Sequence, residues 1–100
     1  MEVEVKINNN SALVKISGRL DTVSALDFEN KIKVLFDLED PDITLDCSDL
    51  NYISSSGLRH FLSIYKNVAS KNGKLVLKNV SAEIKEVLDM TGFTAFLNII

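Results

Sequence analysis

The sequence has no tryptophan, one cysteine, one proline and one histidine, and it has neither a long apolar run nor a basic cluster. A single cysteine excludes an internal disulfide and fits a reducing, cytoplasmic compartment. No segment reaches the roughly 18 apolar residues of a membrane span, and the N-terminus lacks a signal-peptide core. Because the net charge is −3 and no basic run is present, we expect neither nucleic acid nor a membrane surface as partner.

The composition is that of an ordinary globular protein, with 46% hydrophobic and 25% charged residues. A chain of 100 residues can bury one hydrophobic core but not two, so we expect one domain over residues 1–100. The sequence does not predict an oligomeric state.

The first third of the chain predicts a hairpin followed by a helix. Strand-like runs at residues 3–7 and 12–18 flank the polar turn "NNNS", and Gly18 is expected to end the second strand. The helix that follows, capped by Asp21, Thr22 or Ser24 and stopped by Pro41, has one apolar face formed by Ala25, Phe28, Ile32, Leu35 and Phe36. A second apolar stripe on this helix, which either docks a partner or lies between sheet and tail, contains Val23, Leu26, Val34 and Leu38.

The rest of the chain alternates strands and helices. Residues 43–47 are typical of a strand buried on both faces. The helix after them has an apolar side of Leu58, Phe61, Leu62, Tyr65, Val68 and Ala69. Gly73 is suited to a left-handed cap at its end. A strand from residue 74, a helix from Ser81 to Gly92, and a tail that adds an edge strand or packs on the core complete the chain.

This order, β-β-α-β-α-β-α with an optional last strand, predicts a small α/β domain. Its sheet is expected to be mixed and mostly parallel, with helices packed against it. Loops at the carboxyl ends of parallel strands meet at one edge of the sheet, where sites are usually found. The loops at residues 18–22 and 51–58 should therefore place Asp21 near the serines Ser54, Ser55 and Ser56.

The serine triplet stands where a helix begins. One capping serine, worth about 1 kcal/mol, suffices to start a helix, which leaves two without a folding role. A helix N-terminus offers unpaired N–H groups and a partial positive charge, so it can hold a phosphate. Gly57 allows a partner or a phosphate to approach closely. One of the hydroxyls is therefore a candidate phosphoacceptor, whose modification adds roughly −1.5 to −2 charges.

The segment "LDCSDLNYISSSGLRHFLSIYKNV" resembles the core signature of the STAS domain family, which comprises bacterial anti-sigma factor antagonists and the C-terminal domains of sulfate transporters. The pattern is a strand ending in Asp, a Ser, an "L-x-x-I" turn, a serine pair, Gly-Leu and an amphipathic helix. "SGRLDTVSA" upstream and "DMTGF" near the end resemble further parts of the family pattern, in the same order.

This resemblance implies a STAS-like fold and a partner-switching protein. In the family, the unphosphorylated antagonist binds an anti-sigma factor that is also a serine kinase, and so frees the sigma factor for transcription. Phosphorylation breaks the complex, and a metal-dependent (PP2C-type) serine phosphatase resets it. The family pattern places the phosphoacceptor at Ser55, with Ser56 and Ser54 as rivals; Ser54 stands where the family usually has Asp. The partner-binding residues are then expected to be Asp21, Thr22, Val23, Ser54, Ser56, Gly57, Leu58 and Arg59.

Other functions fit the residues less well. A constitutive STAS scaffold, or an accessory subunit of a membrane transporter complex, would keep the fold and lose the phosphorylation. A serine hydrolase needs a base beside the serine, and His60 is expected on a solvent-facing side of its helix. Cys47 is expected as a core residue. We therefore expect no catalytic residue, no metal site and no cofactor.

Overall fold

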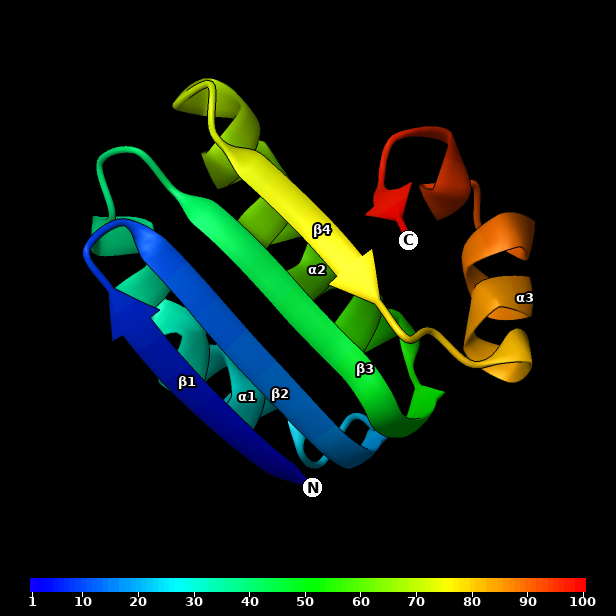
Figure 1. Ribbon diagram of the computed structural model, residues 1–100. Coiled ribbons are helices and arrows are strands. Elements are labelled where there is room, and N and C mark those ends of the chain that lie inside the picture. Colours follow the sequence, from blue (N-terminus) through cyan, green and yellow to red (C-terminus); the bar gives the residue numbers. More distant parts are fainter.

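One five-stranded sheet has the strand order β1-β2-β3-β4-β5, so each strand lies beside its neighbour in sequence. The computed structural model describes residues 1–100 (Figure 1). The strands are β1 (Glu2–Asn8), β2 (Ser11–Leu20), β3 (Asp42–Ile53), β4 (Lys74–Lys78) and β5 (Asn98–Ile99). β1 and β2 form an antiparallel hairpin, and β2 to β5 run parallel. The predicted class, a small α/β domain with a mostly parallel mixed sheet, is confirmed.

Helices connect the parallel strands. They are α1 (Ala25–Ile32), the 3₁₀ helix η1 (Lys33–Asp37), α2 (Ser55–Ser70), α3 (Ala82–Met90) and the 3₁₀ helix η2 (Phe93–Ala95). α1 and α2 lie behind the sheet in Figure 1, while α3 lies beyond the carboxyl end of β4 and packs against β3. None of these helices is both long enough and apolar enough to cross a membrane.

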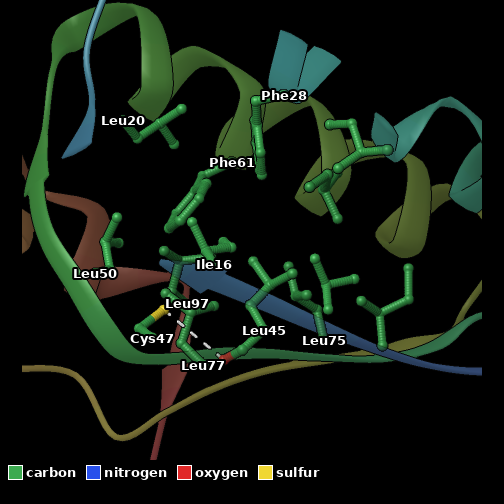
Figure 2. Close-up of a cluster of buried hydrophobic side chains, with 14 of the residues drawn as sticks. Ile16, Leu20, Phe28, Leu45, Cys47, Leu50, Phe61, Leu75, Leu77 and Leu97 are labelled. Atoms are coloured by element: carbon green, nitrogen blue, oxygen red, sulfur yellow. Dashed lines mark hydrogen bonds between the residues drawn. The ribbon is translucent and has the colours of Figure 1, made fainter. Parts of the chain in front are cut away.

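The core lies between the sheet and these helices. Alternate residues of the strands point into it, among them Ile16, Leu45 and Leu77, all fully buried, where they meet Phe28 of α1 and Phe61 of α2 (Figure 2). The strand residues that alternate with these have side chains on the opposite face of the sheet. They are mostly charged and exposed, as in the hairpin of β1 and β2. One face of the sheet is therefore covered by helices, and the other is open and polar.

The first helix is shorter than the periodicity predicts. It ends as an α-helix at Ile32 and continues as η1, whose tighter turn changes the direction of the following side chains. Leu38 follows η1 with an extended backbone and is buried in the core, so the prediction that it lies on a second apolar stripe away from the core face is wrong. Lys71, the residue that follows α2, fixes this segment, because its Nζ donates to the carbonyl oxygens of Phe36 at 2.8 Å and Leu38 at 2.9 Å.

Two glycines have roles that differ from those predicted. β2 does not end at Gly18 but continues to Leu20, and Gly18 (φ 92°) lies at a shift in the β2–β3 register. Gly73 does not supply the left-handed cap, since Asn72 adopts that conformation with φ 55°. A Cβ on Gly73 would instead collide with the carbonyl oxygen of Pro41. Gly73 therefore allows close packing of two backbones.

Two further differences concern β3 and α2. β3 is 12 residues long and reaches the serine triplet, where the sequence predicts a strand over residues 43–47 only. On α2, Leu58, Phe61 and Val68 are buried as predicted, whereas Ala69 is exposed and Ile64 is buried. The tail forms the edge strand β5 and also buries Leu97, which combines both predicted alternatives.

Candidate partner-binding and phosphorylation site

Helix α2 begins with a single side-chain cap, supplied by Ser54. Ser54 has an extended backbone (φ −89°, ψ 172°), and its Oγ accepts a hydrogen bond from the backbone N–H of Gly57 at 3.2 Å. Its own N–H donates to the carbonyl oxygen of Leu20 at 2.8 Å. Ser54 is the one buried polar side chain of the protein, with 9% of its surface exposed. The capping role that the sequence left open among three serines therefore belongs to Ser54.

Ser55 and Ser56 follow the cap in the first helical turn. Ser55 is the first helical residue and is exposed, whereas Ser56 is half-buried. The first turn contains no acidic residue, so nothing on the helix itself offsets the partial positive charge of its N-terminus. Of the three hydroxyls, that of Ser55 is the most accessible to another protein.

Gly57 is required by packing inside the domain. A Cβ at this position would lie 2.8 Å from Leu20 Cγ and 2.9 Å from Ile53 Cγ1, which is closer than side chains approach. Leu20 and Ile53 are paired residues at the ends of β2 and β3. The missing side chain thus lets the first turn of α2 lie directly on the sheet. This internal contact accounts for the glycine that the sequence interpretation attributes to close approach of a partner.

Asp21 lies in the loop before α1 and holds that loop in shape. Its Oδ1 accepts hydrogen bonds from the backbone N–H of Ser24 at 2.9 Å and from the Ser24 hydroxyl at 3.0 Å. In return, the backbone N–H of Asp21 donates to Ser24 Oγ at 2.9 Å. The bond from the Ser24 N–H is the main cause that lowers the pKa of Asp21 below its usual value. Asp21 is therefore a negative charge at neutral pH.

The two loops lie side by side, as the parallel topology predicts. Leu20 pairs with Ile53, and the bond from Ser54 N–H to Leu20 carbonyl oxygen joins the backbones one residue before Asp21 and one residue before Ser55. The sequence offers Asp21, Thr22 and Ser24 as alternative caps of the helix. It does not show that Asp21 and Ser24 bond to each other, so this pairing was missed.

Arg19 and Tyr52 also belong to this edge and were missed by sequence reasoning. They are paired residues near the ends of β2 and β3, and the Arg19 guanidinium carbon lies 4.2 Å from the centroid of the Tyr52 ring. Both residues are exposed. Both residues lie at the carboxyl ends of adjacent parallel strands, and this position could have indicated that they belong to the site. The sequence, however, suggests a turn at Tyr52 and not a strand.

The predicted binding residues divide by exposure. Ser54, Gly57 and Leu58 are buried and hold the loop and helix together. The exposed residues are Thr22, Val23, Ser55 and Arg59. Val23, which precedes α1, is 90% exposed, and Leu26 in the first turn of α1 is 65% exposed, so two apolar side chains close in sequence lie on the surface. Exposed apolar residues thus lie on the element that follows Asp21.

Cys47 and His60 lie apart from this arrangement. Cys47 is fully buried in the core, and this burial raises the pKa of its thiol to about 12, so it is not a nucleophile at neutral pH (Figure 2). His60 is half-buried instead of solvent-facing, because its ring packs edge-on against Phe28, with 6.0 Å between centroids. It lines a shallow hollow between α1 and α2 together with Glu29 and Ser63.

The fold and this site define a small α/β domain with an accessible helix N-terminus at its carboxyl edge, and comparison with known proteins places it in a family. The model of the STAS domain matches residues 2–100. An anti-sigma-B factor antagonist from Bacillus subtilis is 31% identical over 99 residues, which cover 99% of this chain and 90% of the relative. The chain belongs to the STAS domain family.

Solved structures agree on the fold. The anti-sigma factor antagonist SpoIIAA in its unphosphorylated form is similar with a TM-score of 0.82 and 16% identity, covering 99% of this chain and 88% of that one. A Bacillus SpoIIAA in its phosphorylated form gives a TM-score of 0.76 at 17% identity, covering 99% and 91%. At these identities the likeness concerns the architecture, which is confirmed as that of STAS proteins.

Proposed function

We propose that this protein is an anti-sigma factor antagonist that works as a phosphorylation-gated, protein-binding switch in the cytoplasm. In its unphosphorylated form it binds an anti-sigma factor that is also a serine kinase, which frees a sigma factor for transcription. Phosphorylation of Ser55 by this partner ends the complex, and a PP2C-type serine phosphatase restores the binding form. The protein itself catalyses no reaction in this proposal.

The observation that carries the proposal is that the three serines of the triplet have different structural roles. Ser54 is buried and provides the cap, so helix α2 needs neither of the other two hydroxyls in order to begin. Ser55 is exposed at the first helical position. The names of relatives support an antagonist that is phosphorylated, because they include anti-sigma factor antagonists and a similar structure was solved in a phosphorylated form.

A phosphate on Ser55 would be compatible with the fold of the free protein. The first-turn N–H groups of α2 and the helix dipole favour a negative group at this position. The added charge would act mainly on the complex, because it would have to be brought, with its hydration, against the partner's surface. Asp21, whose lowered pKa keeps it ionised, adds negative charge to the same edge. Phosphorylation therefore changes binding more than stability.

The surface we propose for the partner consists of the exposed residues around Ser55. Thr22 and Val23 come from the loop that Asp21 and Ser24 hold in place, Leu26 continues it along α1, and Arg59 lies one turn after Ser55. Val23 and Leu26 provide apolar area, and Arg59 can pair with an acidic group. A mixture of exposed apolar side chains and one arginine is typical of protein–protein contacts.

The test is a comparison of Ser55→Asp with Ala82→Asp, in binding to the serine-kinase anti-sigma factor from the same genome. Both variants add one negative charge at the first position of a helix, in α2 and α3 respectively. We expect Ser55→Asp to weaken binding at least about 10-fold, since a charge is buried against the partner without compensation. We expect Ala82→Asp to bind like the native protein.

Equal binding by Ser55→Asp and the native protein would contradict the charge mechanism. Ser55→Ala completes the set, because it should bind the partner normally and resist phosphorylation. A native protein that binds its partner while remaining unmodified in the presence of ATP would instead be a constitutive scaffold, as would one found as an accessory subunit of a transporter complex.

A further inference from the structure

The sheet has an open edge at β1, on the side away from β3 and β4. β1 pairs with β2 alone, over seven consecutive residue pairs without a register shift. It contains no proline and no bulge, which are common ways to protect an edge strand from pairing with another chain. A straight edge of this length can accept a further strand, so its sequence decides which strand fits.

The unpaired backbone groups of this edge can be assigned from the hairpin. In a hairpin closed by a two-residue turn, the residue pair beside the turn exchanges both backbone hydrogen bonds, and such pairs then alternate along the ladder. Asn8 and Ser11 are that pair. The N–H and C=O groups of Val3, Val5 and Ile7 therefore point outward, away from β2.

The side chains of β1 make it complementary to a second copy of itself. If two β1 strands pair antiparallel about Val5, Glu4 of each copy lies opposite Lys6 of the other, and Val3 lies opposite Ile7. The groups involved are accessible: the Glu4 and Lys6 side chains are 64% and 72% exposed, and Ile7 is 40% exposed. Opposite charges and apolar pairs facing each other across strands are both favourable.

Other registers that use the same backbone groups are worse. Moving the axis to Glu4 forms two Glu2–Lys6 pairs but places the two Glu4 side chains opposite each other and leaves Ile7 without a partner on β1 of the second copy. Moving the axis to Lys6 places the two lysines together and forms no pair of opposite charges. Parallel pairing in register would align every charge with its own copy. Like charges directly opposite each other are destabilising. The closed, two-fold arrangement about Val5 is therefore the register that combines two pairs of opposite charges with no pair of like charges.

We propose that this protein forms a weak homodimer in which two β1 strands pair antiparallel about Val5 and join the two sheets. The contact is a single pair of edge strands and is thus smaller than that of a stable dimer, so it forms at high local concentration. The two-fold symmetry closes the assembly at two copies. The proposed contact is centred on Val5, which pairs with Val14 in the middle of β2, whereas the Asp21 loop and the start of α2 follow the ends of β2 and β3.

The experiment uses sedimentation velocity on the full chain from about 10 μM to about 1 mM, the range in which weak association is measurable. The native protein should shift from monomer to dimer. Glu4→Lys alone and Lys6→Glu alone each convert two attractive cross-strand pairs into repulsive ones, so we expect the dimer dissociation constant to rise at least about 10-fold.

A mixture of the two variants provides the decisive control. In a mixed dimer the two lysines on β1 of the Glu4→Lys copy would face the two glutamates on β1 of the Lys6→Glu copy. An equimolar mixture should therefore dimerise although neither variant does alone. The double variant E4K/K6E should dimerise like the native protein. Thermal unfolding of each variant at low concentration checks that the monomer is folded. A native protein that stays monomeric, or single variants that dimerise like the native protein, would overturn the proposal.

Amide hydrogen exchange tests the register independently. Dimerisation should slow exchange at Val3, Val5 and Ile7 as the concentration rises and leave that of Glu4 and Lys6, already bonded to β2, unchanged. Protection that appears elsewhere, such as along β5, would place the contact at another surface and contradict the proposal.

Discussion

Helices α2 and α3 begin with the same cap, and they differ in what surrounds it. Ser54 and Ser81 both have an extended backbone, and each accepts a hydrogen bond at 3.2 Å from the backbone N–H three residues further along. After Ser81 come Ala82 and Glu83, whose acidic group suits the positive end of a helix. After Ser54 come two more serines and no acidic residue. One serine is enough to begin a helix in this protein.

The position of the two helix ends separates them further. The first turn of α2 lies on the paired ends of β2 and β3 and beside the Asp21 loop, whereas α3 follows the short strand β4. The hydroxyl of Ser55, which the cap does not use, thus lies exposed beside the paired ends of two strands. This difference between two otherwise similar helix ends supports our proposal that the phosphoacceptor lies on α2.

The largest expected change in stability comes from Gly57→Ala. The added methyl group would overlap Leu20 and Ile53, and such overpacking typically costs about 1–3 kcal/mol, more than the roughly 1 kcal/mol that alanine gains in a helix. Urea denaturation should therefore show a net loss of up to about 2 kcal/mol in the free energy of unfolding. Unchanged stability together with lost partner binding would show that Gly57 serves the interface instead.

A smaller change is expected when the two caps are removed. Ser54→Ala and Ser81→Ala each leave one first-turn N–H without its side-chain acceptor, so each should lower the free energy of unfolding by about 1 kcal/mol. Ser55→Ala should change it by less than about 0.5 kcal/mol, as is usual for an exposed position. Chemical denaturation of the three variants measures this order. A loss in Ser55→Ala as large as that in Ser54→Ala would remove the distinction between cap and switch.

Much of this architecture could be predicted because its signals are local. The hairpin, the order of strands and helices, and the start of the last helix at Ser81 follow from periodicity and turn chemistry within a few residues. The adjacency of the Asp21 loop and the serine triplet followed from topology alone, since carboxyl ends of parallel strands share an edge.

The features that could not be predicted depend on contacts between distant segments. The second half of β3 has polar residues that suggest a turn, and it is a strand because β2 continues past Gly18 to pair with it. Leu38 is buried because η1 turns it inward and Lys71, 33 residues away, binds its carbonyl oxygen. Residue type alone does not distinguish the cap Ser54 from Ser55; the bonds that Ser54 makes with Gly57 and with Leu20 do.

The most direct test of the central claim is to locate the phosphate. The purified native protein would be incubated with ATP and the serine-kinase anti-sigma factor from the same genome, then digested and mapped by mass spectrometry, with Ser55→Ala and Ser81→Ala treated in parallel. We predict one phosphate on Ser55, absent from Ser55→Ala and retained in Ser81→Ala. Phosphate on Ser54 or Ser56, or no phosphate on any of the three while the partner still binds, would contradict the account.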